Sequence, residues 1–158
     1  MSEMIFREEA LQEMERIRNR YPDKRAALIP VLHIAQREAG YLSSDCKEMV
    51  ARLLDIPPVD VEGVARFYTM FKNRRMGRYL IQVCTTLPCA LMGAEQMVDY
   101  LSHKLNVKVG GTTADERFSL VTVQCLASCG TGPAMMINGD HFENLTPEKI
   151  DNILAELP

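Results

Sequence analysis

The chain has 158 residues, 47% of them hydrophobic and 25% charged, a globular composition long enough for one domain or for two small ones. The formal net charge is −3 and the one dense basic stretch, KNRRMGR at 72–78, is short, so we expect no nucleic-acid partner. No apolar run is long enough for a transmembrane helix and the N-terminus lacks the apolar core of a signal peptide, so we expect a cytoplasmic protein without direct membrane insertion.

Residues 1–72 are predicted to form an N-terminal helical bundle domain. Apolar residues recur there at helical spacing, and Pro22 is expected to end the first helix and open the second. Gly40 is expected to end the second helix as a C-cap, and Ser43 or Ser44 to cap the third. The helices are expected over 8–20 and 23–39, after Ser43 or Ser44, and over 59–68.

The period of the pattern changes after this bundle, and residues 73–158 are predicted to form a second domain. Its order of elements is β-α-β-β-β-α, which is typical of an α+β or thioredoxin-like fold with helices covering the sheet. Thr146 is expected to cap the closing helix, with Pro147 at the first helical position. The elements are expected at 78–84 (strand), 90–104 (helix), 118–125 (strand), 134–138 (strand), 141–142 (a short strand after an Asn-Gly turn) and 145–157 (helix).

Four of the five cysteines form two close pairs in this second domain, with the spacing C-x4-C-x35-C-x3-C. Cys84 ends the first predicted strand and Cys89 opens the helix after it. Cys125 ends the second long strand and Cys129 follows in the loop. If these two strands are parallel neighbours, both pairs emerge at the same carboxyl edge, where open α/β sheets place their sites. The four sulfur atoms are then expected to converge.

Converging thiols in a reducing compartment favour a metal site over a disulfide framework. Two bare thiolates ~4 Å apart repel by ~4 kcal/mol at an effective dielectric constant of ~20, so four thiolates need a cation between them. An all-sulfur site suits zinc or an iron–sulfur cluster, and the spacing alone leaves both open. The loops CTTLPC and CGTGP favour the cluster, because their N–H and hydroxyl groups can donate to its sulfur atoms.

These residues resemble the small iron–sulfur subunit of the NADH-oxidising module of NADH:quinone oxidoreductase, respiratory complex I. The resemblance rests on the motifs CTTLPC and CLASC, on DVEGVARFYTMF at 60–71 and on QREAGYLS at 36–43. It runs over nearly all of residues 20–157 and is therefore specific to a family. It implies a helical N-terminal domain followed by a thioredoxin-like [2Fe-2S] ferredoxin domain.

The resemblance implies a [2Fe-2S] cluster on Cys84, Cys89, Cys125 and Cys129. It also implies a larger flavoprotein partner that binds FMN and NADH and holds another cluster, beside the other peripheral-arm subunits of the complex. The chain would then be an electron carrier without its own substrate site, peripheral to the inner membrane through the complex. Related subunits serve NAD-linked hydrogenases and formate dehydrogenases, and the motif does not separate these from complex I.

One departure from the family pattern lies in the cysteine loop, where the family usually has glycine at the position of Ala127. A left-handed backbone at this position would make alanine less favourable than glycine by ~1–2 kcal/mol. At the same edge of the sheet, a cis peptide bond between Gly132 and Pro133 is a further hypothesis, because thioredoxin-like folds can hold a cis proline there.

The remaining candidate residues favour structural roles. Cys46 shares an apolar helical face and is expected to be buried rather than to bind metal. His33, His103 and His141 are isolated in sequence, so we expect none of them to be a ligand, and Phe67 is expected at the seam between the domains. No P-loop, G-x-S-x-G, H-E-x-x-H or G-x-G-x-x-G motif occurs, so NAD and FMN should bind the partner.

Two interpretations of a different class remain. One is a zinc-stabilised interaction module, which would be colourless and redox-silent. The other is a thioredoxin-like dithiol enzyme, which would usually need a C-x-x-C motif, and the sequence has none.

Overall fold

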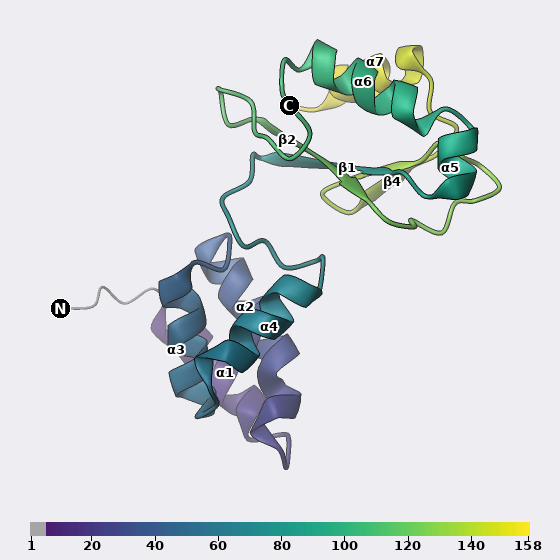
Figure 1. The fold of residues 1–158 in the computed structure, drawn as a ribbon. Coiled ribbons are helices and arrows are strands. Elements are labelled where there is room, and N and C mark those ends of the chain that lie inside the picture. Colours follow the sequence, from purple (N-terminus) through teal and green to yellow (C-terminus); the bar gives the residue numbers. More distant parts are fainter. Residues whose placement is uncertain (1–5) are drawn as a thin grey trace. The chain divides into compact units, whose positions relative to one another are not determined.

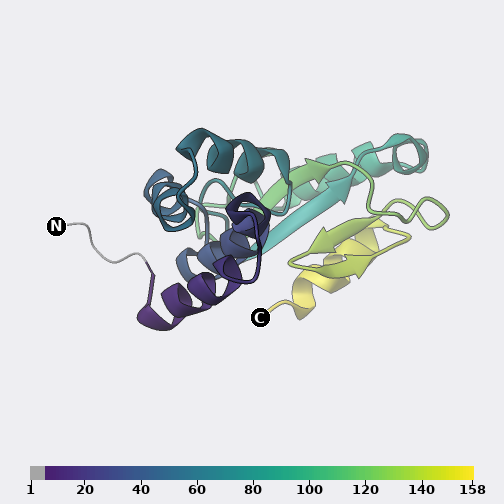
Figure 2. The same ribbon diagram turned by 90° about the horizontal axis from the view of Figure 1, so that it is seen from below.

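The computed structural model describes residues 6–158, and the chain divides into two compact units, Met1–Arg75 and Met76–Pro158 (Figures 1 and 2). This division lies a few residues after the boundary expected between residues 72 and 73, and each unit has its own apolar core. Residues 1–5, the start of the N-terminal segment in which no signal peptide is expected, lie outside the described residues. Within residues 6–158, no helix is long and apolar enough to cross a membrane.

The first unit consists of helices packed around one apolar core. They are α1 (Glu8–Arg18), the 3-10 helix η1 (Lys24–Ala27), α2 (Leu28–Ala39), α3 (Ser44–Leu54) and α4 (Pro58–Phe67). Each α-helix is apolar along one side, so its buried side chains meet those of the neighbouring helices. The most deeply buried large side chains include Met14, Val31, Leu32, Leu42 and Leu54.

The segment around Pro22 differs from the expectation. Helix α1 ends before this proline, with Asn19 at its C-cap, so Pro22 neither ends one helix nor opens the next. Asp23 caps η1 instead, because its side chain accepts a hydrogen bond from the N–H of Arg25 at 2.9 Å. The single helix expected over 23–39 is therefore a 3-10 turn followed by α2.

The connection between α2 and α3 follows the sequence pattern. Gly40 ends α2 with a φ of +79°, a left-handed backbone that glycine adopts without strain. Ser43 is the residue that caps α3, since its hydroxyl accepts from the N–H of Cys46 at 3.2 Å. These two residues fix the turn that folds α3 back onto α2.

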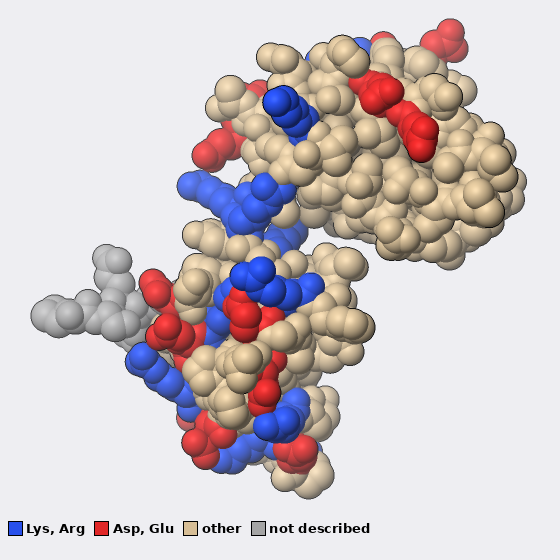
Figure 3. Space-filling model, viewed as in Figure 1, with Lys and Arg blue, Asp and Glu red and all other residues tan. Residues whose placement is uncertain are grey.

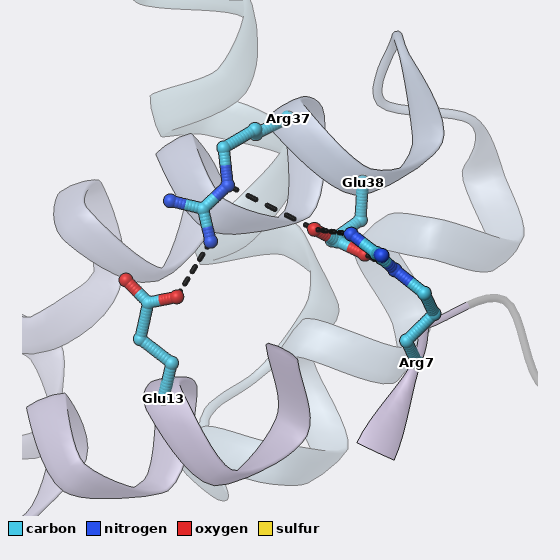
Figure 4. A network of polar contacts seen from close by, with 4 residues as sticks. All are labelled: Arg7, Glu13, Arg37 and Glu38. Atoms are coloured by element: carbon cyan, nitrogen blue, oxygen red, sulfur yellow. Dashed lines mark hydrogen bonds and ion pairs between the residues drawn. The ribbon is translucent and has the colours of Figure 1, made fainter. Parts of the chain in front are cut away.

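A network of ion pairs ties the start of α1 to the end of α2 (Figure 4). The side chain of Glu38 is only 6% exposed, and Arg7 donates to both of its oxygen atoms, at 2.8 and 3.0 Å. Arg37 approaches the same carboxylate at 3.8 Å and pairs with Glu13 at 2.5 Å. The hydrogen bond from Arg7 is the largest cause that lowers the pKa of Glu38. Charge pairing therefore supplements apolar packing in this unit.

The second unit is a four-stranded mixed sheet with two longer helices on one face (Figures 1 and 2). Its strand order is β2-β1-β3-β4, in which β1 and β2 are parallel and the other neighbours antiparallel. Helices α6 and α7 adjoin each other through a hydrogen bond of 2.6 Å from Tyr100 to Asp151. The elements are β1 (Tyr79–Cys84), α5 (Leu87–Leu91), α6 (Ala94–Lys104), β2 (Phe118–Val123), β3 (Met135–Ile137), β4 (Asp140–Phe142) and α7 (Pro147–Glu156).

The α+β class and the order of elements are confirmed, and Thr146 caps α7 as expected, accepting from the N–H of Lys149 at 3.2 Å. Two expected bounds are wrong. The helix expected over 90–104 is two helices, because the backbone of Gly93 is left-handed with a φ of +94° and breaks it. The strand expected over 118–125 ends at Val123, so the cysteine at its predicted end lies in the following loop.

Candidate metal centre

The parallel pairing of β1 and β2 brings the two cysteine pairs to one edge of the sheet. Cys84 is the last residue of β1 and lies opposite Val123, the last residue of β2. Cys89 lies inside the short helix α5 rather than at the start of α6, and Cys125 and Cys129 lie in the loop after β2. The expectation that both pairs leave the sheet at its carboxyl edge is therefore confirmed, although two of the local positions differ.

The sulfur atoms at this edge interact within pairs and between them. Cys84 and Cys89 lie close enough to shift each other's pKa, and Cys125 raises the pKa of Cys129. Cys129 also interacts electrostatically with both members of the other pair. The structure thus places all four cysteines of the predicted motif at one edge of the sheet.

The two pairs differ in exposure. Cys84 and Cys89 are buried, with 2% and 1% of their surface exposed, whereas Cys125 and Cys129 are exposed. A group held between the pairs would therefore have one side within the protein and one side near solvent. Partial exposure of this kind is one of the factors that set the potential of an iron–sulfur cluster.

Hydrogen bonds prepare Cys84 to be a thiolate. Burial raises the pKa of its thiol, but hydrogen bonds from the hydroxyl and N–H of Thr86, from the N–H of Leu126 and from the thiol of Cys89 outweigh burial and lower the pKa. The Thr86 hydroxyl lies 3.1 Å from the sulfur atom. Such donors stabilise a negative sulfur atom whether or not a metal is bound.

Burial and neighbouring sulfur atoms raise the pKa of the thiols of Cys89 and Cys129. Burial is the largest cause that raises the pKa of Cys89, followed by its hydrogen bond with Cys84. The hydrogen bond with Cys125 is the largest cause that raises the pKa of Cys129. Four negative sulfur atoms therefore do not coexist here without a cation, which would also replace these protons.

Backbone donors and a close glycine complete the surroundings of the sulfur atoms. The N–H of Ala127 donates to the sulfur of Cys125 at 3.2 Å, and the N–H of Ala134 donates to Cys89. A Cβ atom at Gly132 would lie 3.3 Å from the sulfur atoms of both Cys89 and Met92, tighter than most such contacts. Glycine therefore leaves the space that the Cys89 sulfur needs.

Two hypotheses about the neighbouring backbone are confirmed. The peptide bond between Gly132 and Pro133 is cis. Ala127 has a φ of +64°, the left-handed backbone at which alanine is less favourable than glycine by ~1–2 kcal/mol. The departure from glycine at this position is thus a strained point in the cysteine loop.

Among the residues expected to be structural, Cys46, His33 and Phe67 belong to the first unit, whereas His103 lies in α6 and His141 in β4. Cys46 is fully buried in the core of the first unit, and burial raises the pKa of its thiol to about 11. His33 packs against Phe71, and the ring of His103 bonds to the backbone of its own helix at 2.8 Å. Phe67 is 77% exposed, and its expected place at a seam between domains stays a prediction.

Ser128 in the cysteine loop and two residues beside it, His141 and Glu143, were not predicted as part of the site. Ser128 lies between Ala127 and Cys129, and its hydroxyl contacts His141 at 3.2 Å and Glu143 at 2.8 Å. No local pattern could have found this contact, because its partners, His141 in β4 and Glu143 just after it, are distant from Ser128 in the sequence. His141, although isolated in the sequence, thus contacts the residue next to Cys129.

The donor set fits a binuclear cluster. Among residues 6–158, no three or more Cys, His, Asp or Glu side chains group closely enough to hold a metal ion. The cysteines instead form one buried and one exposed pair at the same edge of the sheet, which suits a [2Fe-2S] cluster because each of its two irons takes two cysteines. A single zinc ion would need all four sulfur atoms around one centre.

Comparison with known proteins agrees with this fit. The sequence pattern of the thioredoxin-like [2Fe-2S] ferredoxin family matches residues 14–158. The chain is 39% identical to an NADH-quinone oxidoreductase subunit of Rickettsia conorii, over 99% of this chain and 96% of that protein. It is also 39% identical to the mitochondrial NADH dehydrogenase [ubiquinone] flavoprotein 2 of Dictyostelium discoideum, over 96% of this chain and 63% of that protein.

The fold is also found in a solved structure. An NAD+-reducing [NiFe]-hydrogenase in the air-oxidised state superposes with a TM-score of 0.71 at 24% identity, covering 83% of this chain and 23% of that chain. This likeness concerns the fold alone. The family match, over residues 14–158, shows that the chain belongs to the thioredoxin-like [2Fe-2S] ferredoxins.

Proposed function

We propose that this chain is an electron-transfer subunit of an NADH-oxidising complex, most directly NADH:quinone oxidoreductase, and carries one [2Fe-2S] cluster. The observation that carries the proposal is the convergence of two cysteine pairs at one sheet edge, in a chain with near full-length relatives of that complex. Cys84 and Cys89 would hold one iron, and Cys125 and Cys129 the other. The cluster, when bound, supplies a site that accepts and returns one electron.

The chain's own residues perform the supporting tasks. Cys84 is kept ready as a thiolate by Thr86 and Leu126, and the N–H groups of Ala127 and Ala134 donate to two further sulfur atoms. These donors favour negative charge on the sulfur atoms and therefore stabilise the reduced state, which is more negative. Burial of one pair keeps water from the inner side of the site.

The surface around the site supports a protein partner. Residues 79–94 and 118–139, which carry all four cysteines, contain no Asp, Glu, Lys or Arg. In Figure 3 this part of the second unit is a continuous uncharged face where Figure 1 places α5. Leu87, Leu91 and Met92 project from it, 72%, 79% and 47% exposed. Depletion of charge and exposed apolar side chains are typical of the core of a protein interface.

The partner that fits this face is the larger flavoprotein subunit that binds FMN and NADH. Electrons can reach the cluster only from a redox centre close to this edge, so the donor protein must cover it. The lack of nucleotide-binding motifs in this sequence favours NADH and FMN on that partner. The complex would hold the chain at the cytoplasmic side of the inner membrane, beside the other peripheral-arm subunits.

The equivalent subunit of an NAD-linked hydrogenase is the second candidate, favoured by the likeness in fold to an NAD+-reducing hydrogenase. A formate dehydrogenase would use the same site. Both alternatives keep the cluster and the partner type, and differ in the enzyme at the far end of the electron path. The zinc module is less favoured because the family that matches residues 14–158 is one of [2Fe-2S] ferredoxins.

The experiment that tests this function is reduction by NADH in the reconstituted pair. The chain is co-expressed with its flavoprotein, the pair is purified without oxygen, and EPR spectra are recorded before and after NADH is added. We expect a one-electron signal from this chain's cluster that is missing when Cys129→Ser replaces the wild type. Reduction of the flavoprotein's own centres without any signal from this chain, in a pair that holds full iron, would contradict the proposal.

A further inference from the structure

A polar cluster of Ser128, His141 and Glu143, outside the sulfur ligands, joins the cysteine loop to β4 and the residue after it. Ser128, only 7% exposed, lies between the strained Ala127 and Cys129. Its hydroxyl oxygen is 2.8 Å from Oε1 of Glu143 and 3.2 Å from Nε2 of His141. The two partners lie in β4 and just beyond its end, so the contact bridges two segments of the second unit.

The directions of these hydrogen bonds follow from the number of protons. The Ser128 hydroxyl has one proton and donates it to the Glu143 carboxylate, which can only accept. The hydroxyl then accepts from Nε2–H of His141, which assigns the ring proton to that nitrogen. Nδ1 of the same ring lies 3.7 Å from the Glu143 carboxylate. Glu143 is therefore the acceptor at the centre of the cluster.

Glu143 is charged and well tied to the loop. The hydrogen bond from Ser128 is the largest cause that lowers the pKa of its carboxyl, followed by one from Thr131. Backbone bonds support the same junction, from Asn144 N–H to the Thr131 carbonyl at 2.7 Å and from Leu145 N–H to the Pro133 carbonyl at 3.1 Å. The carboxylate thus forms part of a rigid junction at the cysteine loop.

The charge of Glu143 stands out because of its surroundings. The loop that it holds belongs to a stretch, residues 118–139, without a single charged side chain. A negative charge hydrogen-bonded to the residue next to Cys129 is therefore not offset by a cation within that loop. Lys149 lies outside the loop; it donates to the backbone carbonyl of Glu143 at 2.6 Å, and its charge also lowers the pKa of the Glu143 carboxyl.

We propose that Glu143 is a positioning residue that fixes the Cys129 loop through Ser128 and carries a charge that lowers the reduction potential of the cluster. The inference rests on the proposed function, since it needs the cluster to be present. Reduction brings one electron from the flavoprotein partner onto the cluster, and no bond forms or breaks. A carboxylate held near the site opposes that added negative charge, so the oxidised state is favoured.

Three variants distinguish the charge of Glu143 from its tether, the hydrogen bond that joins it to Ser128. Glu143→Gln keeps a carbonyl acceptor of the same length but removes the charge, and Ser128→Ala removes the tether but keeps the charge. Asp140→Asn is the matched control. Asp140 is an exposed acid in β4, three residues before Glu143, and does not belong to the polar cluster. For each, the midpoint potential is measured by EPR-monitored titration and cluster loss by the rate of release to an iron chelator.

We expect Glu143→Gln to raise the potential, so that at a fixed solution potential the ratio of reduced to oxidised cluster rises ~3- to 10-fold, where tenfold is ~59 mV for one electron. Ser128→Ala is expected to release the cluster several-fold faster with a smaller change in potential. Asp140→Asn should match the wild type in both measurements. A potential in Glu143→Gln that equals that of Asp140→Asn would overturn the charge effect.

If Glu143→Gln loads no cluster, a fourth variant still tests the tether. Glu143→Asp keeps the charge and shortens the tether, so it should release the cluster faster than Asp140→Asn while keeping the wild-type potential. Equal release rates in Glu143→Asp, Ser128→Ala and the control would overturn the tether. A wild-type chain that holds no cluster would instead refute the proposed function, which separates the two failures.

Discussion

The two units of the molecule use charge in opposite ways. The helical unit is joined by ion pairs, of which the buried carboxylate of Glu38 with Arg7 and Arg37 is the centre (Figure 4). The ferredoxin unit keeps the segments that carry its cysteines free of charged side chains. The difference indicates that charge in the first unit stabilises its helices, whereas the second unit leaves its cysteine segments uncharged, as the proposed contact with a partner requires.

The largest effect that would test this contrast comes from the cysteines themselves. Cys84→Ser and Cys129→Ser are expected to lose or distort the cluster, because a serine oxygen is a poor substitute for a thiolate ligand of iron. Cys46→Ser is the matched control in the other unit. It should keep the cluster and lower the stability of the helical unit by ~1–3 kcal/mol, because it buries a hydroxyl without a partner. Visible spectra and thermal unfolding report the two effects, and identical spectra for all three variants would refute the ligand assignment.

A second effect concerns the uncharged contact face. Leu91→Asp is expected to weaken binding to the flavoprotein ~10-fold or more, because it would bury an unpaired carboxylate in an apolar contact. Val109→Asp is the control, since Val109 is an apolar residue of the same unit, 46% exposed, in the loop after the far end of α6. Binding is measured by calorimetry with cluster content checked in each sample. Equal loss of affinity in both variants would show that the face around α5 is not the interface.

A smaller effect is expected in the cysteine loop. Ala127→Gly should relieve the left-handed strain at φ +64° and stabilise the ferredoxin unit by ~1 kcal/mol, the lower end of the usual range for alanine in that backbone. Cluster release to a chelator should slow accordingly. Gly132→Ala is the opposite change at the same edge and should speed release, because its Cβ would press on the Cys89 sulfur. A destabilising effect of Ala127→Gly would mean that the methyl group has a favourable contact.

The smallest effect should appear in the pH dependence of the helical unit. Arg7 lowers the pKa of Glu38 below that of the unfolded chain, so the carboxylate stabilises the folded state above about pH 4.3 and this contribution is lost as pH falls through the folded-state pKa. Glu38→Gln should flatten that dependence in thermal melts between neutral and acidic pH. Glu48→Gln is the control, because Glu48 forms an exposed pair with Arg52. The same pH profile in both variants would assign the acid sensitivity to other groups.

The convergence of the cysteines could be predicted from the sequence better than their local structure. A strand, a crossover helix and a second strand predict parallel neighbours, and this pairing alone brings Cys84 and Cys125 to one edge. The apolar pattern continues through Gly93 and so does not indicate the break between α5 and α6, which the left-handed backbone of Gly93 produces. Sequence periodicity does not report a single residue's φ.

The contacts of Ser128 with His141 and Glu143 could not be predicted from local sequence patterns, for a different reason. They join two segments whose approach depends on the antiparallel pairing of β3 with β1 and β4. The family's usual glycine, in contrast, raises the question of a left-handed backbone at Ala127, which the φ of +64° answers. Local chemistry and family comparison therefore predicted the ligands, whereas the residues around them required the fold.

The most direct test of the central claim is an anaerobic visible and EPR spectrum of the purified chain, before and after dithionite, with iron and zinc measured in the same sample. We expect about two irons per chain, a red-brown colour and a one-electron signal that appears on reduction and is absent in Cys84→Ser. A colourless, EPR-silent chain that holds zinc and no iron after anaerobic reconstitution would contradict the claim.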